Sequence, residues 1–181
     1  QPQPEPKKEP SSELHNLFFE EYYRDLPLFE HEEEFDQFYS ILKRPLGVAF
    51  RVSSCDKFSP LIIQKLQDME FKMPEDKKPS PVPWYPQATV KVIEDLSKND
   101  FRKIPAYESY HRYIVEQSDL GRIFRQELVS MIPVLLMDID PSHSVLDMCA
   151  SPGSKTVQIL EMLHKKTPKP QGFVVANEKD T

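Results

Sequence analysis

One short segment of the chain combines residue types and spacing that suit the binding of a nucleotide-like ligand. It covers residues 145–156 (VLDMCASPGSKT), where an apolar run leads into a Pro-Gly turn and then into an amphipathic pattern. A strand, a tight turn and a helix in this order direct free backbone N–H groups and the positive helix end at a ligand. Gly153 lets the backbone approach that ligand closely, where any side chain would collide with it.

An acidic residue further along the chain fits the same kind of site. The next apolar run, residues 172–176, is followed by Asn177 and Glu178. In nucleotide-binding α/β folds, an acid roughly 20–30 residues after the loop accepts hydrogen bonds from both ribose hydroxyls. The loop and the acid together predict a ligand with an adenosine-like end.

Three other interpretations of the loop compete with this one. A P-loop needs the pattern G-x-x-x-x-G-K-[ST], but Ser154 separates Gly153 from Lys155, and Cys149 or Met148 stands where the first glycine belongs. We therefore reject it. A dinucleotide site needs G-x-G-x-x-G, and one glycine in the loop is a weak match. An ordinary strand-to-helix turn stays open, because a Pro-Gly pair alone does not exclude it.

The elements around the loop predict an α/β fold. Residues 145–149 are typical of a buried strand, residues 154–164 of an amphipathic helix and residues 172–176 of a second apolar strand. This order is a β-α-β unit, the signature of an open parallel sheet. Before it, residues 126–137 predict a helix bent by Pro133. Four residues of that helix are expected to be buried: Leu128, Ile132, Leu135 and Leu136.

The front part of the chain begins with two predicted helices. The first is capped by Ser11 or Ser12 and ends at Pro27, and the second covers residues 31–43. Apolar faces are expected on both helices, formed by Leu14, Leu17, Phe18 and Tyr22 on the first and by Phe35, Phe38, Tyr39 and Leu42 on the second. The helical spacing and the lack of interleaved basic residues favour core packing of these aromatic side chains over stacking on bases.

Shorter elements follow and complete a smaller α+β region. Residues 47–53 alternate as a strand, and Ser59 with Pro60 starts a helix. The five prolines of residues 73–86 predict a loop, while residues 88–96 fit either a strand or a helix. A small hairpin is expected from residues 113–116 and 122–124 around Gly121. We place a domain boundary near residues 138–144.

A few side chains of this region allow both a functional and a structural interpretation. Arg51, on the predicted strand, suits either a contact with RNA or a surface charge. Trp84 and Tyr85 lie between prolines and either stack on RNA or form a hydrophobic plug against the following domain, which we favour. Cys55 is expected to be structural or simply exposed.

Composition narrows the class of protein. The 181 residues are 39% hydrophobic and 29% charged, as in globular proteins. No apolar run approaches the roughly 20 residues of a membrane helix. Residues 1–11 are expected to form a disordered tail. The two cysteines lie far apart without metal-ligand neighbours, which argues against a disulfide framework and a metal site and favours reduced thiols inside the cell.

The charge pattern differs between the two ends of the chain. A net charge of −6 counts against RNA binding by the chain alone, because nucleic-acid binders usually present a basic surface. The acidic residues are concentrated between residues 13 and 36, however. Four lysines lie near the loop instead: Lys155, Lys165, Lys166 and Lys169.

Three segments resemble one known family. Residues 125–133 (RQELVSMIP), the loop segment 145–156 and residues 172–177 (GFVVAN) resemble the Sun-domain family of RNA 5-methylcytosine methyltransferases, in particular its eukaryotic tRNA-type members. Segments around Arg44, Phe50 and Trp84 fit the front region of that family more loosely. The resemblance covers most of the chain from about Asn16 onward, and it is most specific over residues 125–156.

This resemblance implies a fold and a cofactor. It implies an RNA-positioning α+β region over residues 12–138 and the start of a Rossmann-like domain for S-adenosyl-L-methionine (SAM) over residues 139–181. Seven residues would surround SAM: Cys149, Ala150, Ser151, Pro152, Gly153, Ser154 and Lys155. Glu178 would bind the ribose, and Asp147 would orient the loop. The family usually has alanine at position 151 and aspartate at position 178, so we expect the affinity for SAM to fall without recognition being lost.

The resemblance also bears on catalysis. The reacting cysteines of the family lie in Pro-Cys and Thr-Cys-Ser motifs that these residues lack, which implies a nucleophile beyond Thr181 and no catalytic residue before it. Cys149 is therefore expected to be a small buried residue.

The function expected from these residues is that of a fragment. We expect an inactive fragment of an RNA, in particular tRNA, cytosine-5 methyltransferase located in the nucleus or nucleolus. The alternatives are a non-catalytic RNA- or partner-binding product and a methyltransferase that acts on protein or a small molecule.

Overall fold

The computed structural model describes residues 16–44, 46–86, 88–94, 101 and 103–179. Contacts divide the chain into two compact units, residues 1–45 and residues 46–181. Both helices and strands are present, and the strands form one antiparallel and one parallel sheet. The α/β class and the β-α-β unit predicted from the sequence are therefore confirmed.

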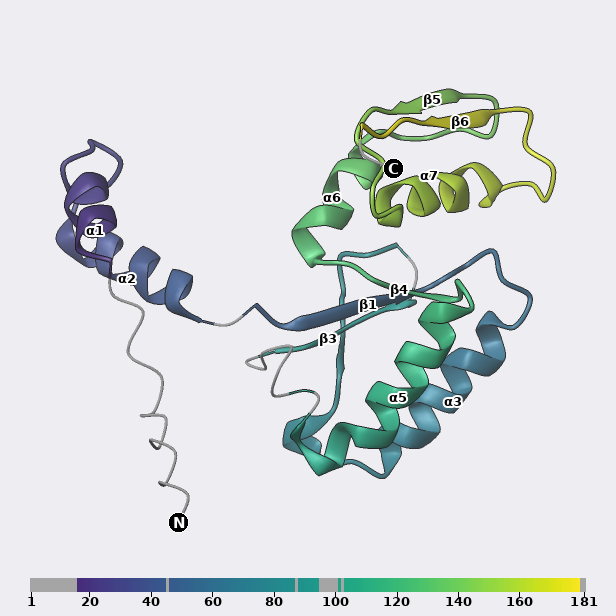
Figure 1. The fold of residues 1–181 in the computed structure, drawn as a ribbon, viewed down its shortest axis with the longest axis horizontal. Coiled ribbons are helices and arrows are strands. Elements are labelled where there is room, and N and C mark those ends of the chain that lie inside the picture. The colour runs from purple at the N-terminus through teal and green to yellow at the C-terminus, as the bar shows by residue number, and fades with distance from the viewer. Residues whose placement is uncertain (1–15, 45, 87, 95–100, 102, 180–181) are drawn as a thin grey trace, which may run out of the picture. The chain divides into compact units, whose positions relative to one another are not determined.

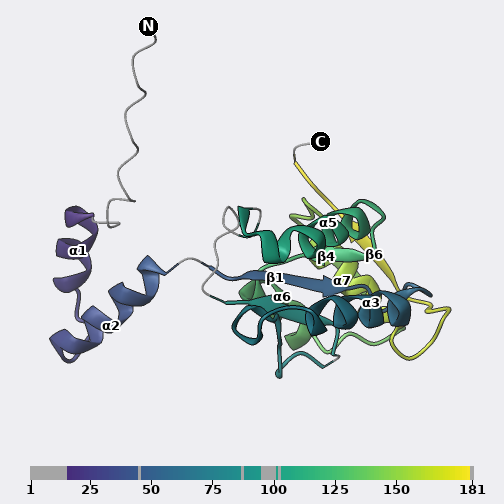
Figure 2. The same ribbon diagram turned by 90° about the horizontal axis from the view of Figure 1, so that it is seen from below.

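The first unit is a pair of adjacent helices, α1 (Leu17–Arg24) and α2 (Glu32–Lys43) (Figure 2). The Asn16 side chain caps α1 by accepting a hydrogen bond from the Phe19 N–H at 3.1 Å. Aromatic rings join the helices, with centroids 6.1 Å apart for Phe19 and Tyr39. Phe35 of α2 is buried, as predicted.

The predicted apolar face of the first helix is wrong. Leu17, Phe18 and Tyr22 are exposed, because the start set by Asn16 turns Phe19 and Tyr23 toward α2 instead. On α2, Leu42 is exposed as well. The predicted cap at Ser11 or Ser12, and Leu14, lie outside the described residues.

The second unit is built on a four-stranded antiparallel sheet in the order β2-β3-β1-β4. Its strands are β1 (Val48–Val52), β2 (Ser80–Pro81), β3 (Val90–Ile93) and β4 (Ile123–Arg125). The segment for which strand and helix were both open thus forms β3. All five residues of β1 are buried, because the strand lies inside the sheet and both sheet faces are covered.

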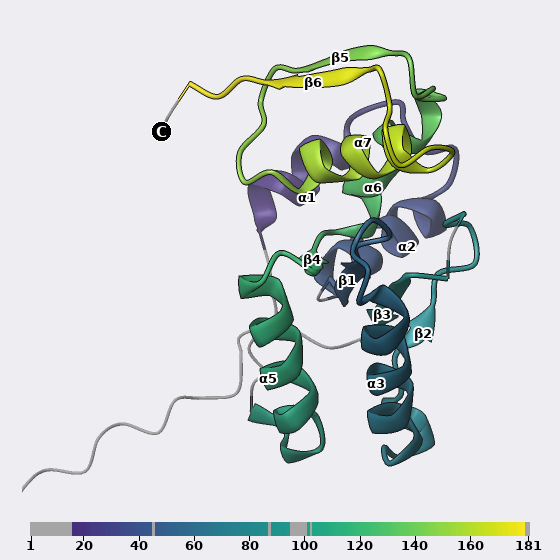
Figure 3. The ribbon, with the colours of Figure 1, turned by 90° about the vertical axis from the view of Figure 1, so that its right-hand side faces the viewer.

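Helices cover the two faces of this sheet (Figures 1 and 3). Helices α3 (Ser59–Phe71) and α5 (Pro105–Asp119) lie on one face, with the 3-10 helix η1 (Glu75–Lys77) following α3. Helices α6 (Leu128–Leu136) and α7 (Ser154–His164) lie on the other. Because side chains alternate along a strand, Phe50 enters the cluster under α3 and α5, while Ala49 enters the cluster under α6 and α7.

A two-stranded parallel sheet completes the unit on the far side of α7 (Figure 1). It pairs β5 (Ser144–Asp147) with β6 (Phe173–Ala176), and Val145 lies opposite Val174. Gly172 precedes β6 at a point of close backbone approach, since a Cβ there would lie 2.2 Å from the His143 carbonyl oxygen. Only glycine fits this position.

The predictions for the segments that form α5 and α6 are wrong in part. Residues 113–116 lie in α5 and form no hairpin, and β4 pairs with β1 instead. The β-branched Ile114 and Val115 suggested a strand, but Tyr107, Tyr110 and Ile114 bury one helical face. In α6, Ile132 and Leu136 are exposed and Leu128 and Leu135 are only partly buried, because the helix turns Met131 and Val134 to the core.

The domain boundary near residues 138–144 stays a prediction. One hydrophobic cluster joins residues from both sides of it, including Tyr85 and Val90 before the boundary and Ile159 and Met162 after it. The two sequence regions therefore share a core within the second unit.

Candidate functional site

The loop between β5 and α7 is fastened to the segment that follows β6. The Ala150 N–H donates to the Asn177 carbonyl at 2.9 Å, and the Asn177 N–H donates to the Asp147 carbonyl at 2.8 Å. The Asn177 side-chain amide donates to the Met148 carbonyl at 3.0 Å. These bonds place the predicted loop and the predicted acid at one end of the parallel sheet, as expected for the carboxyl ends of its strands.

Gly153 gives this loop the geometry expected for a ligand site. Its φ of 97° lies in the left-handed region, and an added Cβ would meet nothing within 4 Å. The space beside its Cα is therefore open. The backbone at this position has a conformation that glycine adopts more readily than other residues. The first turn of α7 begins at Ser154, and its N–H groups need partners outside the helix.

The carboxylates of Glu178 and Asp147 accept hydrogen bonds from the loop and from the first turn of α7. One Glu178 oxygen accepts the Ser151 N–H at 2.7 Å, and the other accepts the Lys179 N–H at 2.8 Å. Asp147 accepts a hydrogen bond from the Thr156 hydroxyl at 2.6 Å, which ties the end of β5 to the first turn of α7. Asp147 thus contacts the helix that follows the loop, and Glu178 contacts the loop itself, while their expected roles toward a cofactor stay predictions.

The remaining predicted residues lie at the surface of the loop. Ser151, Pro152 and Lys155 are exposed, whereas Ala150 and Ser154 are partly buried. The expectation of a buried Cys149 is wrong, because its side chain is exposed.

The catalytic nucleophile is expected to lie beyond Thr181. Thr181, beyond which the reacting cysteines of the family were expected, lies outside the described residues. The placement of the nucleophile after Thr181 therefore stays a prediction. Cys149 and Cys55 are both free thiols at the surface, and neither is assigned a catalytic role.

A buried polar cluster behind the loop was missed by the sequence interpretation. Arg51 of β1 is completely buried and forms an ion pair with Glu161 of α7, which is 2% exposed. Its Nη2 donates to the Ser154 carbonyl and its Nε to the Gln126 side chain, each at 3.4 Å. Both interpretations of Arg51, as an RNA contact and as a surface charge, are therefore wrong.

The cluster extends to two glutamines. The Gln126 amide donates to Gln158 at 3.0 Å, and the Gln158 amide donates to the Met131 carbonyl at 3.0 Å. Burial raises the pKa of Glu161, against the opposing effect of Arg51. A sequence signal was available, because Gln158 and Glu161 fall on the apolar face of the α7 pattern, where a polar side chain requires a buried partner.

The favoured interpretation of Trp84 and Tyr85 as a hydrophobic plug is confirmed for Tyr85 but not for Trp84. Tyr85 is 4% exposed and packs in the cluster with residues of α6, β5 and α7, so it is the hydrophobic plug. Trp84 is 45% exposed. Cys55 is exposed, in agreement with one of its two interpretations.

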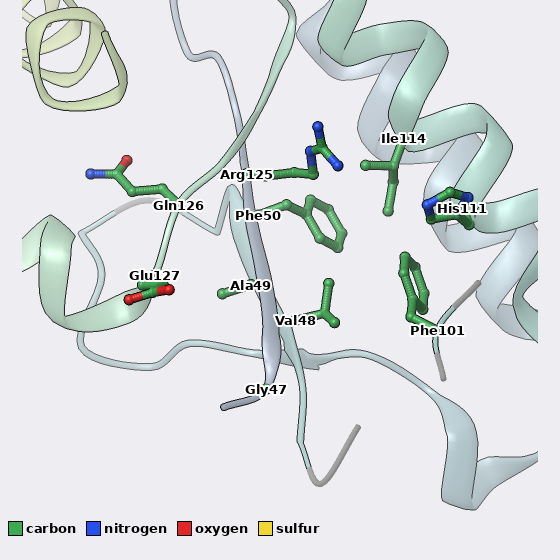
Figure 4. A pocket seen from close by; sticks show the side chains of 10 residues that line it. All are labelled: Gly47, Val48, Ala49, Phe50, Phe101, His111, Ile114, Arg125, Gln126 and Glu127. Atoms are coloured by element: carbon green, nitrogen blue, oxygen red, sulfur yellow. The ribbon is translucent and has the colours of Figure 1, made fainter. Parts of the chain in front are cut away.

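A separate cavity of about 370 Å³ opens beside β1 (Figure 4). Val48, Phe50 and Ile114 form an apolar floor, and the rings of Phe101 and His111 meet edge to face, with centroids 5.1 Å apart. Arg125 contributes an exposed guanidinium. Figure 4 shows the neighbouring Gln126 and Glu127 side chains directed away from Phe50 and His111. The cavity lining therefore combines apolar walls with one basic residue, Arg125, and one acidic residue, Glu127.

Within the described ranges, no helix is long and apolar enough to cross a membrane. The same residues contain no group of three or more His, Cys, Asp or Glu side chains that could hold a metal ion.

Comparisons with known proteins identify relatives over most of the chain. It is 39% identical over 173 residues to the multisite-specific tRNA:(cytosine-C(5))-methyltransferase of Saccharomyces cerevisiae, covering 91% of this chain and 25% of the relative. It is 34% identical to a tRNA (cytosine(34)-C(5))-methyltransferase of Drosophila melanogaster, covering 91% and 24%. The chain thus spans about a quarter of the length of these relatives. No family model matches it.

The fold also occurs in a solved structure. A methyltransferase homologue from Pyrococcus horikoshii superimposes with a TM-score of 0.51 at 22% identity, covering 80% of this chain and 39% of the other. At this identity, the likeness concerns the fold.

Proposed function

Because the chain belongs to the tRNA cytosine-C5-methyltransferase family, we propose that its β5–α7 loop binds SAM and that the whole protein methylates carbon 5 of cytosine in tRNA. The observation that carries the proposal is the open space beside Gly153, at the start of α7 and two residues after the Ser151 N–H that Glu178 accepts. SAM, when bound, supplies an electrophilic methyl group. The residues of this chain bind and orient it.

Each predicted residue has a task in this proposal. The backbone of residues 149–155 approaches the ligand, with Gly153 as the point of closest approach. Glu178 offers carboxylate oxygens beside the loop for the ribose hydroxyls, and the Ser151 N–H that it accepts already aligns it. Asp147, bound to Thr156, keeps the helix start in register with the strand end.

Two matched glycine variants test the cofactor site. Gly153 and Gly121 both have positive φ and open space around an added Cβ, but Gly121 lies between α5 and β4. Gly153→Val should weaken SAM binding at least about 100-fold, or about 2.7 kcal/mol, in isothermal titration calorimetry. Gly121→Val carries the same kind of backbone strain and should keep the affinity of the unaltered protein. Equal affinities of the two variants would contradict the proposal.

The substrate is tested by product analysis. The whole protein, incubated with labelled SAM and either tRNA or a mixture of proteins, should place the label in 5-methylcytosine of the tRNA. Label in protein alone would favour the alternative, a methyltransferase that acts on protein.

We also propose a nuclear location on the basis of the family, to be tested by imaging the tagged whole protein. Exclusion of the tagged protein from nuclei would refute it.

The cavity beside β1 supports the RNA part of the proposal. Its aromatic and aliphatic walls suit the face of an unstacked base, and Arg125 suits a phosphate. Arg125→Ala should lower the affinity for tRNA in filter binding, and the loss should shrink as salt rises. Arg112→Ala, on the exposed side of the same helix as His111, is the matched control and should change the affinity little.

A further inference from the structure

We propose that Arg51 is a positioning residue for the SAM-binding loop: from β1 it holds the first turn of α7, and with it Gly153, in the binding geometry. The inference rests on the proposed function of that loop. It assigns a role to a residue of the antiparallel sheet, far from the loop in the sequence.

The contacts of Arg51 span the first eight of the eleven residues of α7. One guanidinium nitrogen reaches the Ser154 carbonyl at 3.4 Å, in the residue directly after Gly153. Another forms the ion pair with Glu161, seven residues and about two helical turns further on. Two contacts along one helix fix both its position along its axis and its rotation. A shift of Arg51 therefore moves the start of α7 relative to the loop.

The loop is held from the opposite side by the parallel sheet. Thr156 binds Asp147 at 2.6 Å and Ser151 binds Glu178 at 2.7 Å, so β5 and the segment after β6 fix one side of the helix start. Arg51 fixes the other side from a different sheet. Gly153 lies in the chain between Ser151, which Glu178 holds, and Ser154, which Arg51 holds, so the position of its backbone depends on both contacts.

The energetics of the pair indicate a role beyond stability. Glu161 is 2% exposed, and its Oε1 has no hydrogen-bond partner among the residues that the structure describes. Such a pair costs desolvation that apolar side chains of similar size avoid, so replacing both members is often neutral or stabilising. An arginine here adds what apolar residues lack, a planar fork that reaches two fixed acceptors at once.

The test separates positioning from stability in the whole protein. Arg51→Met leaves Glu161 buried without its cation and should lower Tm strongly. The double variant Arg51→Met with Glu161→Met removes both charges and should recover most of that Tm. Its SAM affinity should nevertheless stay at least about 10-fold weaker than in the unaltered protein, by calorimetry. Arg122→Met removes a partly buried arginine that pairs with Asp56, and should change SAM affinity less than about two-fold.

A second readout needs no SAM. Backbone amides of residues 151 and 153–157 should exchange hydrogen several-fold faster in the double variant, while amides of α3 should exchange at the unaltered rate. Arg51→Lys keeps the charge but lacks the fork, so it should also weaken SAM binding with little change in Tm.

The outcomes distinguish the two proposals. If the double variant or Arg51→Lys binds SAM as tightly as the unaltered protein, Arg51 has no positioning role. If the unaltered protein binds no SAM, the proposed function of the loop fails, and the exchange rates alone decide whether Arg51 holds the start of α7. Unchanged exchange at residues 151 and 153–157 would overturn the inference in that case.

Discussion

Strands β1 and β5 are both short, yet they differ in burial. All five residues of β1 are buried between two layers of helices. In the parallel pair, Val145 and Val174 face α7, whereas Leu146 is 59% and Val175 is 48% exposed. The stability of the second unit therefore depends mainly on the antiparallel sheet, and the candidate site lies on the part with one covered face.

This difference separates folding from binding within one unit. The antiparallel sheet has hydrophobic clusters on both faces, and the buried Arg51 of β1 forms an ion pair with Glu161 of α7. The parallel pair depends on α7 and on hydrogen bonds at its carboxyl end. A substitution in β1 should thus reduce stability, while one in the loop should mainly reduce ligand binding.

The largest effect is expected for Arg51→Met, and it should depend on pH. The pKa of Glu161 is raised by burial, and loss of the Arg51 cation raises it further. When the pKa of a carboxyl group is higher in the folded state than in the unfolded state, the folded state becomes less stable as the pH rises above the pKa of the unfolded state, about 4.3. The variant should lose about 3–5 kcal/mol at pH 8 and less at pH 5, by urea unfolding.

The neighbours of Glu161 define the control for that pH dependence. Cys55 and Tyr85 also interact electrostatically with Glu161. Glu161→Gln in the Arg51→Met background removes the carboxyl but keeps both neighbours, so the difference between pH 5 and pH 8 should disappear. A loss of stability that is equal at both pH values in the single variant would show that Glu161 does not titrate as described.

A smaller effect is expected for Val52→Ala on β1. Val52 is 2% exposed, and two methyl groups transferred from water are worth about 0.8 kcal/mol each, to which the cavity adds. The free energy of unfolding should fall by about 2 kcal/mol, measured by urea denaturation. A loss below about 0.5 kcal/mol would show that β1 is less tightly packed than its burial indicates.

Thr156→Val tests the connection between β5 and α7. It removes the hydrogen bond to Asp147 while keeping the shape of the side chain, and should cost about 1 kcal/mol. Thr156→Ser keeps the hydroxyl and should retain most of that stability. Equal losses for the two variants would assign the effect to packing of the methyl group instead.

The smallest effect is expected for Val175→Ala, the counterpart of Val52→Ala on the parallel pair. At 48% exposure the side chain loses little buried surface, so the free energy of unfolding should change by less than about 0.5 kcal/mol. The same denaturation experiment checks it. A loss matching that of Val52→Ala would remove the contrast between the two sheets.

The sequence predicted the β-α-β unit closely. Residues 154–164 were expected to form a helix, and α7 has those bounds. The Pro-Gly turn marked the loop, because proline and glycine restrict the backbone locally and their effect needs no knowledge of distant residues. The acid at position 178 was also placed beside the loop, since parallel strands end at the same edge of a sheet.

The failures share a different cause. The burial of Arg51 depends on a partner 110 residues away, and the exposure of Ile132 and Leu136 depends on which side of α6 meets α7. Local patterns give the period of an element and leave its rotation against the core undetermined. The α5 segment was missed because Ile114 and Val115 have high strand propensity, which tertiary packing overrides.

Gly172 has a consequence for the register of the parallel strands. A backbone carbonyl occupies the place of any side chain at this position, and the Gly172 N–H donates to the Pro141 carbonyl at 2.7 Å. Sliding β6 along β5 would bring Phe173 or Gln171 against that carbonyl, which excludes the neighbouring registers. The glycine at the start of β6 therefore fixes the register of the strand, and this register places Glu178, beyond the other end of β6, beside Ser151.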